Sequence, residues 1–145
     1  MGVYIDTGIL VKLYVKEPNS LQAIALATGF PTPLALTPFQ ELEIRNAVRL
    51  KQSRGELTEL EARAALADFE TDIAAQRYKR PACDLSSVFA RAELLSAAHA
   101  VSTKCRSLDT LHVAAALETG MREFVSLDMR QRAMAQAAGL RVLPA

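Results

Sequence analysis

The sequence contains sixteen Asp and Glu residues, and a few of them stand in apolar surroundings where a carboxylate is uncommon. Asp6 directly follows an apolar run at residues 3–5. Asp128 follows a similar run at residues 124–127, so the chain repeats the pattern of a strand that leads into an aspartate. Carboxylates placed after buried strands lie at the edge of an open α/β sheet where ligands usually bind. The pattern therefore predicts an acidic site at that edge.

Two further acids belong to predicted helices. On the helix that begins at Pro38, about 100° of rotation per residue places Glu43 on an apolar stripe. That stripe comprises Phe39, Leu42, Glu43, Asn46, Ala47 and Leu50. Glu41 faces the opposite side and is expected to be solvated. Asp109 stands in the first turn of a helix at residues 107–118 that is apolar on nearly every side. A carboxylate among apolar neighbours is costly unless something neutralises it.

Each of these acids also has an explanation that involves no chemistry. Glu43 would pair with a nearby arginine, and Asp109 would favour the first turn of its helix because of the helix dipole. Asp128 would cap the next helix in a capping box with Gln131. A cap is a weaker explanation for Asp6, because no Glu or Gln follows it three residues later.

Taken together, the four acids predict a metal site. Like charges gathered in a cleft repel one another, and a hard divalent cation is the usual remedy. The chain has two histidines and two cysteines, Cys83 and Cys105, without the spacing of zinc ligands. An all-oxygen site suits Mg²⁺ or Mn²⁺, which activate water and stabilise the charge of a phosphodiester transition state.

Composition and charge limit the other possibilities. Half of the 145 residues are apolar and the formal net charge is +1, so the chain is expected to form one globular domain over residues 1–145. Nucleic-acid binding would have to depend on local basic patches. No apolar run approaches the roughly 18 residues of a membrane span. The first residues lack the layout of a signal peptide, and a cytoplasmic location is expected.

Strands and helices alternate along the predicted chain. The expected strands are residues 3–5, 34–36, 124–127 and 141–143, with a loop or edge strand within 77–84. The expected helices are residues 9–15, 21–27, 38–54, 58–73, 85–99, 107–118 and 129–138. Strands separated by helices indicate an α/β fold whose parallel sheet has helices on both faces.

The motifs that carry these acids resemble those of a known family. Residues 4–14 look like the opening of PIN-domain nucleases, specifically of VapC-type toxins of type II toxin–antitoxin systems. Residues 43–48 resemble their glutamate-bearing helix, and residues 106–116 resemble their third motif. Residues 124–131 with Gly139-Leu140 resemble the last motif. The motifs occur in the family's order, and only residues 55–84 lack a signature.

The resemblance implies a three-layer α/β/α fold with a central parallel sheet of about four or five strands. It implies a Mg²⁺- or Mn²⁺-dependent endoribonuclease that hydrolyses RNA, has a small antitoxin partner and forms a homodimer. Asp6, Glu43, Asp109 and Asp128 would be the catalytic acids. Asp6 and Asp109 would bind the metal, Asp128 would bind it directly or through water, and Glu43 would orient the attacking water.

The chain departs from the family pattern at Gly8, where a serine is common, and at Ser126, where a threonine is common. Gly8 lacks a hydroxyl that would support metal binding. His112, three residues after Asp109, is expected to form a structural hydrogen bond in the core. Ile44 and Val48 lie away from the Glu43 stripe and suggest a surface for a dimer or antitoxin.

Several cations are candidates for a phosphate-binding rim, although each alone could be a solvated charge. These are Lys12, Arg45, Arg49, Lys51, Arg54, Arg130 and Arg132.

Two other functions remain open. A receiver-like signalling module would use an acidic pocket to accept a phosphoryl group, but it would need a lysine after a late strand, where this chain has Asp128. A PIN-like regulatory protein would keep the pocket and bind metal or RNA without turnover.

Overall fold

The computed structural model describes residues 2–145, and these divide into two compact units. The first unit contains the residues up to Asp6 together with Pro81–Ala145, and the second unit contains Thr7–Arg80. All paired strands in both units are parallel, as predicted for an α/β protein. No helix within residues 2–145 has both the length and the apolar character that crossing a membrane requires.

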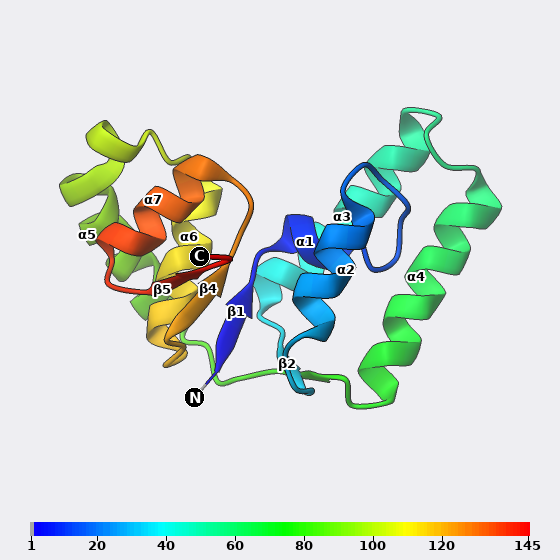
Figure 1. Ribbon diagram of the computed structural model, residues 1–145, viewed down its shortest axis with the longest axis horizontal. Coiled ribbons are helices and arrows are strands. Elements are labelled where there is room, and N and C mark those ends of the chain that lie inside the picture. Colours follow the sequence, from blue (N-terminus) through cyan, green and yellow to red (C-terminus); the bar gives the residue numbers. More distant parts are fainter. Residues whose placement is uncertain (1) are drawn as a thin grey trace. The chain divides into compact units, whose positions relative to one another are not determined.

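The first unit is built around a three-stranded parallel sheet in the order β1-β4-β5 (Figure 1). Its elements are β1 (Val3–Ile5), α5 (Leu85–Thr103), α6 (Ser107–Glu118), β4 (Glu123–Val125), α7 (Met129–Ala137) and β5 (Arg141–Leu143). The register places Ile5 opposite Val125, and Val125 opposite Leu143. The carboxyl ends of β1 and β4 are therefore neighbours.

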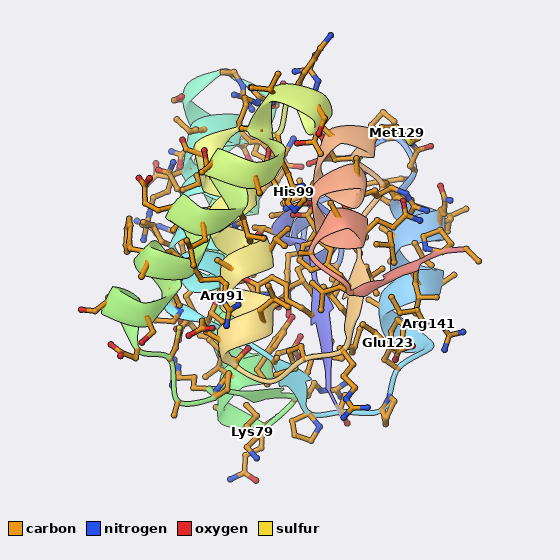
Figure 2. The ribbon with its side chains drawn as sticks, turned by 90° about the vertical axis from the view of Figure 1, so that its left-hand side faces the viewer. Lys79, Arg91, His99, Glu123, Met129 and Arg141 are labelled. Carbon is orange, nitrogen blue, oxygen red and sulfur yellow. The ribbon has the colours of Figure 1, made fainter. Side chains whose placement is uncertain are left out.

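The core of the first unit forms where apolar helices pack together and onto the sheet. α6 is buried along most of its length, as its uniformly apolar sequence predicted, and it packs against α5 and α7. Two ion pairs lie at the surface of this unit. Arg91 of α5 pairs with Glu118 of α6 at 2.9 Å. Arg141 of β5 lies 3.3 Å from Glu123 of β4, and both of these residues are labelled in Figure 2. Because these pairs are at the surface, each contributes at most about 1 kcal/mol.

The second unit contains a helical hairpin and a two-stranded parallel sheet. Its elements are α1 (Thr7–Val11), α2 (Ser20–Thr28), β2 (Leu34–Ala35), α3 (Pro38–Ser53), α4 (Glu59–Ala74) and β3 (Tyr78–Lys79). Both predicted capping boxes are present, with Thr37 and Gln40 at the start of α3 and Thr58 and Glu61 at the start of α4. Gly55 joins the two helices with a φ of 76°, in the left-handed region that favours glycine.

Some predicted boundaries were wrong. The parallel strands of the described residues form one sheet of three strands and one of two, where a single central sheet of about four or five strands was expected. β4 ends at Val125, before the predicted limit, because the Ser126 hydroxyl and Asp128 already belong to the cap of α7. The helix predicted at residues 9–15 is the shorter α1, which ends in turns that continue to Val15.

The predicted face of α3 was also wrong. The buried stripe consists of Gln40, Ile44 and Val48, which are at most 1% exposed, whereas Leu42 of the predicted stripe is 67% exposed. Ile44 and Val48 therefore belong to the core and do not form a docking surface. Glu41 is not solvated either, since its side chain is only 15% exposed. The packing of α3 against α1 and α4 decides which face is buried.

Aromatic side chains and one aspartate form a cluster in the core of the second unit. The Tyr14 hydroxyl donates to Asp72 Oδ2 at 2.7 Å and lies 2.6 Å from the Tyr78 hydroxyl. Phe69 contacts both tyrosine rings edge to face, with ring centroids 5.4 Å from Tyr14 and 5.6 Å from Tyr78. Burial, followed by the Tyr78 hydrogen bond, raises the pKa of Tyr14. Burial also raises the pKa of Tyr78, to about 12.

This cluster should make the protein less stable at alkaline pH. An unfolded tyrosine ionises near pH 10, whereas folded Tyr78 stays neutral up to about 12. The raised pKa means that the folded state favours neutral Tyr78, so the contribution of Tyr78 to the free energy of unfolding is complete below pH 10. That contribution is lost as the pH rises toward 12, at about 1.4 kcal/mol per pH unit. Urea unfolding between pH 9 and 12 measures this slope. The Tyr78→Phe variant should have a smaller slope, and an unchanged slope would contradict the assignment to Tyr78.

Candidate active site

Asp6 and Asp128 both lie at the carboxyl edge of the three-stranded sheet. Asp6 follows β1, and its backbone N–H donates to the carbonyl of Val125, the last residue of β4, at 2.8 Å. Asp128 is the N-cap residue of α7 and follows Val125 by three residues. The two strands pair in register, so the chain segments that carry these aspartates leave the sheet side by side. The sequence predicted this arrangement from the repeated strand-to-aspartate pattern.

Asp128 has a capping role. Its Oδ1 accepts a hydrogen bond from the Gln131 backbone N–H at 2.9 Å, which satisfies one of the unpaired donors at the start of α7. The buried Ser126 hydroxyl accepts from the Asp128 N–H at 3.1 Å and donates to Gln131 Oε1 at 2.8 Å. The predicted cap is thus present, although the Gln131 side chain bonds to Ser126. Asp128 itself is exposed, so a cap does not prevent its carboxylate from meeting a ligand.

Asp109 lies in the first turn of α6, and its side chain is neither fully buried nor fully exposed. Residues 119–122 alone connect α6 to β4, so α6 must run in the opposite direction to that strand. The start of α6 therefore lies toward the carboxyl edge of the sheet, where Asp6 and Asp128 are found.

Two of the carboxylates influence the thiol of Cys105. Burial raises the pKa of its thiol, and a hydrogen bond with Thr110 lowers it. The negative charges of Asp109 and Asp128 each raise the pKa further. Both carboxylates therefore lie within electrostatic reach of this thiol in the first unit.

Glu43 belongs to the second unit, on α3. Its side chain lies at the edge of the buried stripe and is partly exposed. Glu41, another partly buried acid on this helix, binds Arg80 through two hydrogen bonds of 2.8 and 3.0 Å. These hydrogen bonds lower the pKa of Glu41. Burial opposes this shift, and the positive charge of Arg45 adds to it. Glu41 is therefore held in a structural ion pair, and Glu43 remains the catalytic candidate on α3.

The chemistry of the donors suits a hard cation, since carboxylate oxygens are the ligands that Mg²⁺ and Mn²⁺ prefer. Within residues 2–145, no three His, Cys, Asp or Glu side chains stand close enough together to form a ready metal-binding group. The aspartates of the first unit thus offer the type of ligand atom that such an ion prefers, and they belong to the same edge of the sheet. They do not form a preassembled cage.

Most of the cations considered for a phosphate-binding rim have structural partners. Arg45 pairs with Glu70 at 2.7 Å, and Lys51 pairs with Glu17 at 2.7 Å. Arg54 pairs with Glu56, and Arg132 donates to the carbonyls of Ser126 and Pro144. Lys12, Arg49 and Arg130 remain as candidates for contact with phosphates.

Two buried polar contacts were not found from the sequence. The Tyr4 hydroxyl lies 2.6 Å from His112 Nδ1, and Ser126 bonds to Gln131 beneath Asp128. His112 was correctly predicted to form a structural hydrogen bond, but its partner is 108 residues away and nothing in the local sequence indicated Tyr4. The Ser126 contact could have been found, because a serine two residues before a capping aspartate is well placed to join the cap.

No protein-family model matches the chain, and no curated protein sequence matches it either. A solved structure does: the crystal structure of FitAcB from Neisseria gonorrhoeae aligns with a TM-score of 0.69 and 17% sequence identity, over 97% of this chain and 95% of that chain. The chain has a PIN-like fold. This confirms the fold that the four motifs predicted.

Proposed function

We propose that the protein is a cytoplasmic, Mg²⁺- or Mn²⁺-dependent endoribonuclease that acts as the toxin of a type II toxin–antitoxin pair. The observation that supports this best is the in-register pairing of β1 with β4, which carries Asp6 and Asp128 to one edge of the sheet. Asp109, in the first turn of α6, would complete the site from that helix. The PIN-like fold is consistent with the VapC-type motifs at these positions.

The proposed roles follow from the chemistry of the side chains. Asp6 and Asp109 would hold the metal ion, and Asp128 would bind it directly or through water. When bound, such an ion lowers the pKa of a coordinated water and neutralises charge on the phosphodiester. Asp128 is held by the hydrogen bond that its carboxylate accepts from the Gln131 N–H, and because the residue is exposed it would still be accessible to the ion. Glu43 would orient the attacking water by accepting a hydrogen bond from it.

The proposed toxin requires partners. The resemblance to VapC-type toxins supports a small antitoxin protein and a homodimer. The protein also carries exposed apolar side chains that a partner would cover, among them Leu42 and Leu50 on α3 and Leu21 on α2. The receiver-like alternative has no comparable support, because a receiver needs a lysine after the late strand and this chain has Asp128 after β4.

Expression of the wild-type chain and of Asp6→Asn in the same host tests this function. The wild type should stop growth and produce discrete cuts in total RNA, and the purified protein should need Mg²⁺ or Mn²⁺ and be inhibited by EDTA. Asp6→Asn removes one negative ligand and should reduce cleavage by at least about 100-fold. Circular dichroism should confirm that the variant is folded.

Full RNA cleavage by folded Asp6→Asn would refute the assignment. If the wild type binds Mn²⁺ tightly and cuts no RNA, the protein is a regulatory binding protein instead.

A further inference from the structure

A buried hydrogen bond connects two of the elements that carry the proposed ligands. Tyr4 of β1 and His112 of α6 are both 0% exposed, and the Tyr4 hydroxyl lies 2.6 Å from His112 Nδ1. Their rings also meet edge to face, with centroids 5.8 Å apart and an interplanar angle of 62°. Both residues belong to the first unit, and Tyr4 is one of the largest side chains in its core.

The positions of this pair along the chain relate it to the acidic site. Tyr4 precedes Asp6 by two residues, which is about 7 Å along an extended strand and on the same side of it. His112 follows Asp109 by three residues, which is about 4.5 Å along a helix and on the same face. α6 runs opposite to β4 and to β1, the parallel neighbour of β4. The path from Tyr4 to Asp6 and the path from His112 back to Asp109 therefore both lead to the carboxyl edge of the sheet.

Tyr4 has a second contact that extends this arrangement. Its ring stacks on Phe124 of β4, with centroids 5.4 Å apart and an interplanar angle of 4°. The chain continues from β4 to Asp128 only four residues after Phe124. The Tyr4 side chain, on the strand that leads to Asp6, therefore contacts the helix that carries Asp109 and the strand that leads to Asp128.

We propose that Tyr4 and His112 are positioning residues that set the spacing between Asp6 and Asp109 and thereby the affinity for the metal ion. This inference rests on the proposed function, because it concerns the same site. The hydrogen bond fixes how far α6 can slide along β1, and such a slide would separate the two carboxylates. A bond between side chains that are fully enclosed is also protected from competition with water.

A pair of substitutions at His112 tests the role of the bond. The amide of Asn can occupy the position of His Nδ1, whereas the longer Gln places its amide near the position of Nε2. His112→Asn should keep a partner for the Tyr4 hydroxyl and bind Mn²⁺ within about threefold of the wild type. His112→Gln and Tyr4→Phe should each weaken Mn²⁺ binding by about 10-fold or more, as expected for residues that support metal ligands.

Mn²⁺ binding to the purified full chain, measured by electron paramagnetic resonance, provides the readout, and the metal concentration for half-maximal RNA cleavage provides a second one. Leu95→Ala on α5 is the matched control, since it removes a buried apolar side chain from the core of the first unit and leaves both Tyr4 and His112 in place. It should lower the unfolding temperature and leave Mn²⁺ affinity unchanged, so a general loss of stability is distinguished from loss of positioning. Should His112→Gln fail to fold, Tyr4→Phe decides the question.

Wild-type Mn²⁺ affinity in folded Tyr4→Phe and His112→Gln would overturn the positioning role alone and leave the proposed function intact. A wild-type protein that binds no Mn²⁺ and cuts no RNA would overturn the proposed function and, with it, this role.

Discussion

The Asp128→Asn variant is expected to lose RNA cleavage by at least about 100-fold while its fold remains intact. Asn caps helices as well as Asp does, so its side-chain oxygen can still accept the 2.9 Å hydrogen bond from the Gln131 N–H. What the substitution removes is the negative charge that is proposed to bind the metal, directly or through water. Cleavage of a defined RNA at saturating Mn²⁺, together with the urea midpoint, measures both effects.

Asp128→Ala is the matched comparison, because alanine removes the charge and the cap together. It should lose cleavage to the same extent and also lose about 1 kcal/mol of stability, the usual cost of removing a cap. Should Asp128→Asn cleave RNA like the wild type while Asp128→Ala is merely less stable, then Asp128 is only a helix cap. The two substitutions therefore separate the two explanations that the sequence left open.

Features encoded by neighbouring residues could be predicted from the sequence. The capping boxes at Thr37 and Thr58 were correct because a cap involves a side chain and a backbone N–H only three residues apart. The repeated strand-to-aspartate pattern also correctly placed Asp6 and Asp128 after strands. Parallel pairing of β1 with β4 then brings the two together.

Features that depend on distant packing could not be predicted. The count of apolar residues on α3 favoured the face with Leu42, but the packing partners of the helix bury Gln40 and Ile44. Gln40 is acceptable in the core because its side chain accepts a 2.7 Å hydrogen bond from the Thr37 N–H. The contact between Tyr4 and His112 spans 108 residues, and no local pattern encodes a pair at that separation.

Phe69→Ala is expected to lower the free energy of unfolding by about 3–5 kcal/mol, a large part of the stability of a typical domain. Phe69 is 1% exposed and is the central ring of the aromatic cluster in the second unit. It contacts Tyr14 and Tyr78 edge to face, and the Arg45 guanidinium lies 5.3 Å from its ring centre. The other buried positions of α4 are alanines, too small to fill the space that the ring would leave.

Phe69→Leu separates the volume of the ring from its aromatic contacts. Leucine fills most of the space but cannot make the two edge-to-face contacts, each of which contributes about 0.5–1.5 kcal/mol beyond burial. A loss of about 1–3 kcal/mol is therefore expected for this variant. Because the chain has no tryptophan, urea unfolding followed by circular dichroism and tyrosine fluorescence is the suitable measurement. If Phe69→Ala lowers the free energy of unfolding by less than about 1 kcal/mol, packing around Phe69 is secondary to the hydrogen bonds of Tyr14 with Asp72 and Tyr78.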